Sequence, residues 1–209
     1  METTRAPWFT RDYTRRPLTD NEAAFLTTLS SKLTTIAPAQ VRPEDTAVTA
    51  EGNSCLICLV PHQCLGGLSI VATLAGARAD VSWAQVTDLS YHDELDMAFC
   101  VATLVTASPG KLLAQRAADS VVEQLQRPIL LRAHFAGDDQ LRRVECLLRA
   151  GEEPLHRVAK FGRASSWVRR LWRSDAIREV EVSFTNPSPP PWSEACDPSK
   201  WFARYESSA

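Results

Sequence analysis

The chain has 209 residues, of which 44% are hydrophobic and 23% are charged, and its formal net charge is -2 at pH 7. This composition is typical of a globular protein, and it excludes a disordered tail, a collagen-like repeat and a polytopic membrane protein. The small net charge gives the whole chain no attraction to nucleic acid or to anionic lipid.

The N-terminal residues lack the apolar core and the cleavage site of a secretory signal peptide, so we expect a cytoplasmic chain with free thiols. Residues 52–77 contain no Asp, Glu, Lys or Arg and are numerous enough to span a bilayer. Turn-forming residues at 61–63 and 66–67 interrupt this stretch. It therefore predicts a buried hairpin of two strands, 55–60 and 68–75, and no membrane span.

The first predicted helix begins at a capping box, in which Thr19 and Glu22 each satisfy a backbone N–H of the other residue. Pro38 ends it. Its predicted core face consists of apolar residues at helical spacing: Leu26, Leu29, Leu33 and Ile36. A polar connection over residues 40–45 follows. Further strands are predicted at 79–86 and at 97–106, where the period is ambiguous but the β-branched residues favour a strand.

The second half begins with another helix, which starts at the Ser108-Pro109-Gly110 cap and ends before Pro128. Its apolar stripe is Leu113, Ala117, Val121 and Leu125. Strands are then predicted at 129–135, 141–149 and 155–161, a short basic helix at 164–173 and a last strand at 179–184.

These elements predict an α+β fold, in which antiparallel β-meanders pack against two main amphipathic helices. Each half reads as a helix followed by a meander, which suggests a pseudo-repeat of residues 19–106 and 108–185, although the residues themselves show no similarity. We expect one α+β domain over residues 1–185. Residues 186–209 form a proline-rich strap and an aromatic tail that we expect to dock on this domain.

Four soft ligands within ten residues raise the hypothesis of a metal site: Cys55, Cys58, His62 and Cys64. A zinc knuckle needs both thiolates on one turn, whereas the apolar neighbours place the first two cysteines on a strand, where they point to opposite faces. No second CxxC follows. The residues therefore favour a buried hairpin with apolar thiols, and we expect no metal and no cofactor.

An acidic turn is the second candidate, because it gathers an imidazole and three carboxylates: His92, Asp93, Glu94 and Asp96. On a helix, the first and last of these share a face and could exchange a proton or hold a cation. The alternative is that the acidic residues cap a helical turn or solvate a loop.

A basic and aromatic segment is the third candidate, with Arg163, Trp167, Arg169, Arg170 and Arg173 as the expected binding residues. Residues 127–178 contain 12 basic and 6 acidic side chains, whereas residues 17–105 contain 3 basic and 10 acidic ones. The charge is therefore segregated along the chain. Nucleic acid is a weaker expectation than protein, because the whole chain lacks a basic isoelectric point.

The sequence contains no G-x-S-x-G, G-x-G-x-x-G, H-E-x-x-H or phosphate-loop motif. The interpretation that we favour is a non-catalytic cytoplasmic protein-binding domain, which neutralises, escorts or scaffolds a protein partner or associates with itself. The alternative is a small-molecule-binding protein or enzyme with its acidic site at residues 92–96. The sequence names neither the partner nor a substrate.

Overall fold

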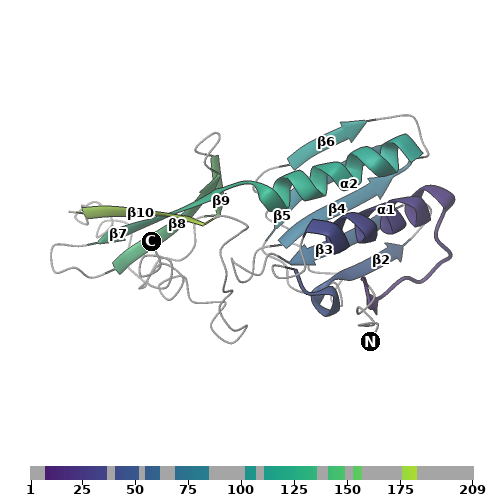
Figure 1. Ribbon diagram of the computed structural model, residues 1–209, viewed down its shortest axis with the longest axis horizontal. Helices are drawn as coiled ribbons and strands as arrows, with labels where there is room; N and C mark the ends of the chain where they lie inside the picture. Colours follow the sequence, from purple (N-terminus) through teal and green to yellow (C-terminus); the bar gives the residue numbers. More distant parts are fainter. Residues whose placement is uncertain are drawn as a thin grey trace. The chain divides into compact units, whose positions relative to one another are not determined.

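The structure is a computed structural model of residues 1–209. Contacts divide the chain into two compact units, Met1–Gln126 and Arg127–Ala209 (Figure 1). The residues that the structure describes are 8–36, 41–51, 55–61, 69–84, 102–106, 111–135, 141–148, 153–156 and 176–182.

The first unit contains a six-stranded sheet, whose strands lie side by side in chain order. The strands are β1 (Arg11–Asp12), β2 (Ala47–Glu51), β3 (Cys55–Pro61), β4 (Ser69–Ala75), β5 (Arg78–Ala84) and β6 (Ala102–Thr106). Every pairing is antiparallel except the parallel contact of β1 with β2. A 3-10 turn over Pro43–Asp45 leads into β2.

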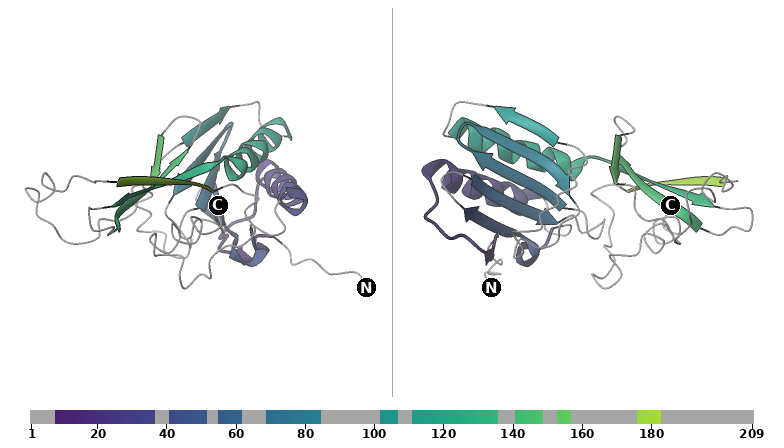
Figure 2. Two further views of the ribbon diagram at one scale, coloured as in Figure 1. Left: turned by 60° about the vertical axis from the view of Figure 1, so that its left-hand side comes forward. Right: turned by 180° about the vertical axis from the view of Figure 1, so that it is seen from behind.

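Two helices, α1 (Asp20–Ile36) and α2 (Lys111–Gln126), pack on each other and cover one face of this sheet (Figures 1 and 2). The indole Nε1 of Trp83 on β5 donates to Oε1 of Gln124 on α2 at 3.0 Å, which identifies the face that the helices cover. The buried strand positions on that face are Val48, Ala50, Leu56, Cys58, Val60, Ile70, Ala72, Leu74, Ala79, Val81 and Trp83. Val105 on β6 lies on the same face and is half-buried. The α+β class with an antiparallel meander is therefore confirmed.

On the opposite face of the sheet, solvent exposure changes from one end of the strands to the other. At one end Ala47, Leu59, Val71 and Ala84 form a buried cluster against which Tyr13 and Ile57 pack. At the other end the same face is exposed, at Ala75, Arg78 and Asp80.

The stretch that could have spanned a bilayer instead forms β3 and β4, which are antiparallel neighbours, so the predicted hairpin is confirmed. Among the described residues, no helix has both the length and the apolar character needed to cross a membrane.

The capping box at the start of α1 is confirmed. The Thr19 backbone N donates to Glu22 Oε2 at 2.8 Å, and the Glu22 backbone N donates to Thr19 Oγ1 at 3.4 Å. The predicted core face is confirmed at Leu29 and Leu33, whereas Glu22 and Phe25 are buried in place of Leu26 and Ile36. Leu26 and Ile36 are only half-buried, because the helix turns the side that carries Glu22 toward the protein.

The stripe predicted for α2 is confirmed, since Leu113, Ala117, Val121 and Leu125 are all fully buried. This helix contacts α1, β4, β5 and β6, and it therefore belongs to the first unit by its contacts. The helix-plus-meander pseudo-repeat, in which the same helix would open the second half, stays a prediction.

A four-stranded antiparallel sheet forms the second unit, in the order β10-β7-β8-β9. Its strands are β7 (Ile129–Phe135), β8 (Leu141–Leu148), β9 (Glu153–His156) and β10 (Ala176–Val182). Buried and half-buried residues alternate along β7, as expected for a sheet with one face toward solvent. The predicted helix at 164–173 and the strap and tail at 186–209 lie outside the described residues.

Gly76 turns the chain between β4 and β5 with a backbone φ of +60°. We expect Gly76→Ala to lower the free energy of unfolding by about 1 kcal/mol, because a Cβ is strained in this left-handed conformation although nothing lies within 4 Å of it. Urea unfolding measures the change. Gly76→Asn is the control and should cost less, since asparagine tolerates this conformation. Equal stability of the alanine variant and the parent would contradict the prediction.

Candidate functional site

The two described members of the predicted metal-site candidate, Cys55 and Cys58, lie on β3 as free thiols. Side chains alternate along a strand, so the two thiols point to opposite faces: Cys58 is buried under the helices and Cys55 is half-buried on the other side. His62 and Cys64 lie outside the described residues. Within the described part of the chain, no three His, Cys, Asp or Glu side chains gather as a metal site would require.

Both cysteines are held in the protonated state. Burial raises the pKa of the Cys58 thiol well above its ordinary value, and the negative charge of Glu22 raises it further. Burial also raises the pKa of Cys55, again with a contribution from Glu22. Because metal binding and thiol exchange both require the thiolate, this environment opposes both reactions at neutral pH.

A partly buried ion pair lies beside Cys55. Arg16 and Glu22 form a bidentate salt bridge, in which Nη1 donates to Oε2 at 2.8 Å and Nη2 donates to Oε1 at 2.6 Å. The same Nη2 also donates to the backbone carbonyl of Cys55 at 3.3 Å. The hydrogen bond from Arg16 is the largest cause that lowers the pKa of Glu22, so this carboxylate stays ionised. Its oxygens are used by the guanidinium and the cap, so the pair has a structural role.

The acidic turn, His92, Asp93, Glu94 and Asp96, lies outside the described residues, as do Arg163, Trp167, Arg169, Arg170 and Arg173. The roles predicted for these residues stay predictions. The strand order does show which strands the basic segment connects. The segment joins β9 to β10, and these two strands are the opposite edges of the second sheet. Residues 157–175 are thus tethered to that sheet at both ends.

The half-exposed face of the second sheet carries two cross-strand pairs that the sequence did not single out. Arg132 Nε on β7 contacts Glu179 Oε1 on β10 at 2.6 Å, and the two residues are register partners. Ile177, which is 55% exposed, is the register partner of His134 on the same two strands. The alternation of β7 could have predicted the face, but the pairing with β10 required the sheet order.

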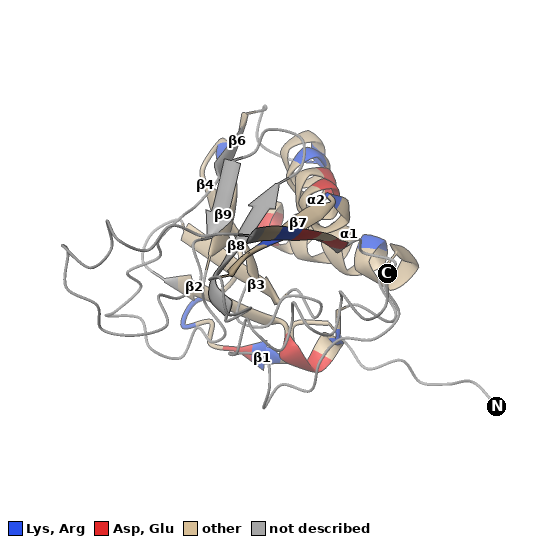
Figure 3. Ribbon diagram, turned by 90° about the vertical axis from the view of Figure 1, so that its left-hand side faces the viewer, with Lys and Arg blue, Asp and Glu red and all other residues tan. Residues whose placement is uncertain are grey.

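The boundary between the two units is also a boundary of charge. Residues 1–126 contain 14 acidic and 9 basic side chains, whereas residues 127–209 contain 11 acidic and 14 basic ones. Figure 3 shows Lys, Arg, Asp and Glu on the described ribbon. The segregation predicted along the sequence therefore coincides with a division of the fold.

Comparison with known proteins adds no relative: no family model, curated protein or solved structure matches the chain.

Proposed function

We propose that this protein is a non-catalytic protein-binding module, whose second unit presents a basic surface to an acidic protein partner. The observation that carries the proposal is the change in the sign of the charge at the boundary between the two units. A surface with an excess of one charge attracts partners of the opposite charge and discriminates against others.

The basic segment supplies the recognition surface in this proposal. The segment that carries Arg163, Arg169, Arg170 and Arg173 is joined in the chain to both edge strands of the second sheet. Arginine presents a planar set of donors that fits carboxylates, and Trp167 adds an amphipathic aromatic side chain of the kind that is enriched at interfaces.

The proposal is tested by reversing two charges, in the double variant Arg169→Glu/Arg170→Glu. We expect immobilised full-length protein to retain acidic proteins from a nuclease-treated lysate, and the variant to retain them about tenfold less. The partner identified by mass spectrometry is then titrated against both proteins at low and high salt. Thermal stability should stay nearly unchanged.

A matched control reverses two exposed cations of the first unit, Arg78→Glu/Lys111→Glu, and changes the net charge by the same amount. This control should bind the partner as the parent does. Equal binding by the Arg169/Arg170 variant at low salt would refute the proposed surface. Retention from an untreated lysate but not from the nuclease-treated one would identify nucleic acid as the ligand and would also refute the proposal.

A further inference from the structure

Among the described strands, β6 lies at an edge of the first sheet and pairs with β5 alone. Its own residues offer little protection against pairing with a new strand. Its residues Ala102–Thr106 include neither a charge nor a proline, and Thr103, Val105 and Thr106 are β-branched. Natural proteins usually protect such an edge with lysine, proline or a bulge, because its backbone groups can pair with another strand.

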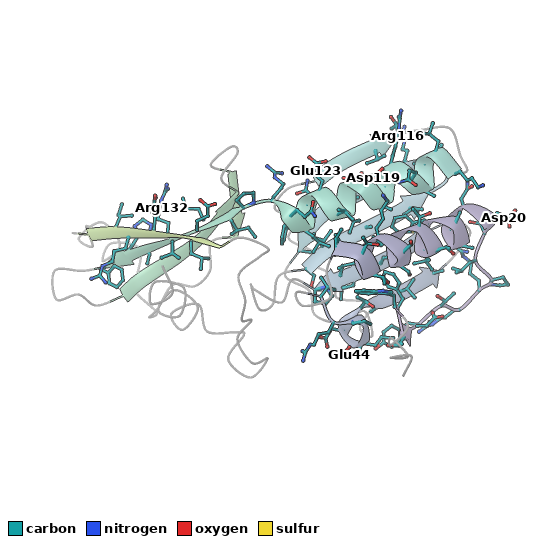
Figure 4. All side chains as sticks on the ribbon, viewed as in Figure 1. Asp20, Glu44, Arg116, Asp119, Glu123 and Arg132 are labelled. Atoms are coloured by element: carbon teal, nitrogen blue, oxygen red, sulfur yellow. The ribbon has the colours of Figure 1, made fainter. Side chains whose placement is uncertain are left out.

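The flank of α2 beside this edge carries charges of both signs. Arg116 Nη1 donates to the carbonyl of Thr106 at 3.4 Å, so this side of α2 faces β6. Glu123 lies seven residues further on, which is almost two full turns, and it therefore shares that side with Arg116 (Figure 4). Leu112, one turn before Arg116, is 51% exposed. Within the described residues, neither Arg116 nor Glu123 has an ion-pair partner.

We propose that β6 pairs antiparallel with β6 of a second copy of this chain about a two-fold axis. The two sheets then join edge to edge, and the two α2 helices run antiparallel, with Arg116 of each copy facing Glu123 of the other. A two-fold interface is self-complementary, so the single Arg116–Glu123 contact occurs twice. This surface lies in the first unit and goes beyond the proposed partner site.

The positions of Arg116 and Glu123 along the direction of β6 fit this arrangement. α2 runs antiparallel to β6 and contacts it (Figure 1). The midpoint between Arg116 and Glu123 lies about 5 Å along α2 from Arg116, at 1.5 Å per residue. Measured back from Thr106, whose carbonyl Arg116 contacts, the same length at about 3.3 Å per residue ends between Val105 and Leu104. Leu104 is the middle of β6, so a strand pairing centred there brings Arg116 to within about one strand residue of the level of Glu123 of the second copy.

The spacing across the joint also fits. α2 contacts β4, β5 and β6 and so lies above β5. Two copies joined at β6 would place their α2 axes three strand spacings apart, about 14 Å. That distance exceeds the 8–10 Å of directly packed helices. Extended arginine and glutamate side chains can bridge it, whereas short apolar side chains cannot. The charged side of α2, with Arg116 and Glu123, is therefore compatible with this interface between two copies.

The oligomeric state of the full chain tests the proposal, measured by native mass spectrometry and by sedimentation over a range of concentrations. We expect a dimer. Arg116→Glu should raise the dissociation constant of the dimer about tenfold, because it creates two like-charge contacts. Glu123→Arg should have the same effect. The double variant Arg116→Glu/Glu123→Arg should restore the dissociation constant to within about threefold, because the pair is re-formed with its charges exchanged.

Glu44→Arg, which reverses an exposed charge on the turn that precedes β2, is the control and should leave the dimer intact. Circular dichroism of each variant checks that the fold is kept. A monomer at every concentration would overturn the proposal, and so would a dimer that is indifferent to Arg116→Glu or is not restored by the exchange. The Arg169→Glu/Arg170→Glu variant should remain dimeric, which separates this proposal from the partner site.

Discussion

Replacing Glu22 by alanine is expected to lower the free energy of unfolding by about 3 kcal/mol, because it removes a helix cap and leaves a guanidinium without its carboxylate. The side chain of Glu22 is only 4% exposed and that of Arg16 is 19% exposed, so water replaces the lost contacts poorly. Glu22→Gln keeps an acceptor for the Thr19 N–H but loses the charge, and we expect it to cost about half as much. Urea unfolding measures both variants.

The Glu22 contribution should also depend on pH. The hydrogen bond from Arg16 lowers the pKa of Glu22 in the folded protein below its ordinary value of 4.5. The folded state therefore binds this proton less readily than the unfolded state does, and the stabilisation is complete above about pH 4.5 and is lost as the pH falls through the folded pKa. The stability difference between the parent and Glu22→Gln should shrink in that acidic range.

Asp20→Asn provides the matched control for Glu22, because it neutralises an exposed carboxylate in the same first turn of α1. Its effect should stay within about 0.5 kcal/mol. A Glu22→Ala variant as stable as the Asp20→Asn variant would contradict the structural role of the pair. A parent-to-Glu22→Gln difference that is constant from neutral to acidic pH would contradict the charge effect.

Trp83→Ala is expected to lower the free energy of unfolding of the first unit by about 4 kcal/mol. Trp83 is fully buried between β5 and the helices, and its indole N–H donates to Gln124 Oε1 at 3.0 Å. The substitution therefore removes a large apolar surface and a buried hydrogen bond together. Trp83→Phe should cost less, because the ring retains most of the packing. Urea unfolding followed by circular dichroism measures both changes.

Leu112→Ala is the control for Trp83, since it truncates a side chain on α2 that is 51% exposed, and it should change the stability by less than about 0.5 kcal/mol. A double-mutant cycle of Trp83→Phe with Gln124→Leu should show a coupling of about 1 kcal/mol. Independent effects of the two substitutions would show that the indole N–H contributes nothing through Gln124.

The candidate site follows from the sequence only in its local part. The strand period predicts that Cys55 and Cys58 point to opposite faces, and the structure places them so. The Arg16–Glu22 pair could not be predicted, because Arg16 precedes α1 and its partner depends on how the chain enters the helix. The pairing of Arg132 with Glu179 likewise joins residues 47 positions apart.

By itself, the sequence determined the features that depend on neighbours along the chain. The capping box at Thr19 and the strand β7 both follow from local geometry, and each lies where the sequence predicts it. The α+β class also follows, since helical and alternating periods are local properties of the chain.

Tertiary structure alone decided the rest. Leu26 and Phe25 both fit a helical apolar stripe with Leu29 and Leu33, and the packing of α1 in the folded chain buries Phe25 and leaves Leu26 half-buried. β2 was not predicted at all, because its short sequence becomes a strand by pairing with β3. The placement of α2 on the first sheet depends in the same way on contacts with distant residues. The free energy of burial comes from those contacts, and a local pattern cannot specify which partner supplies them.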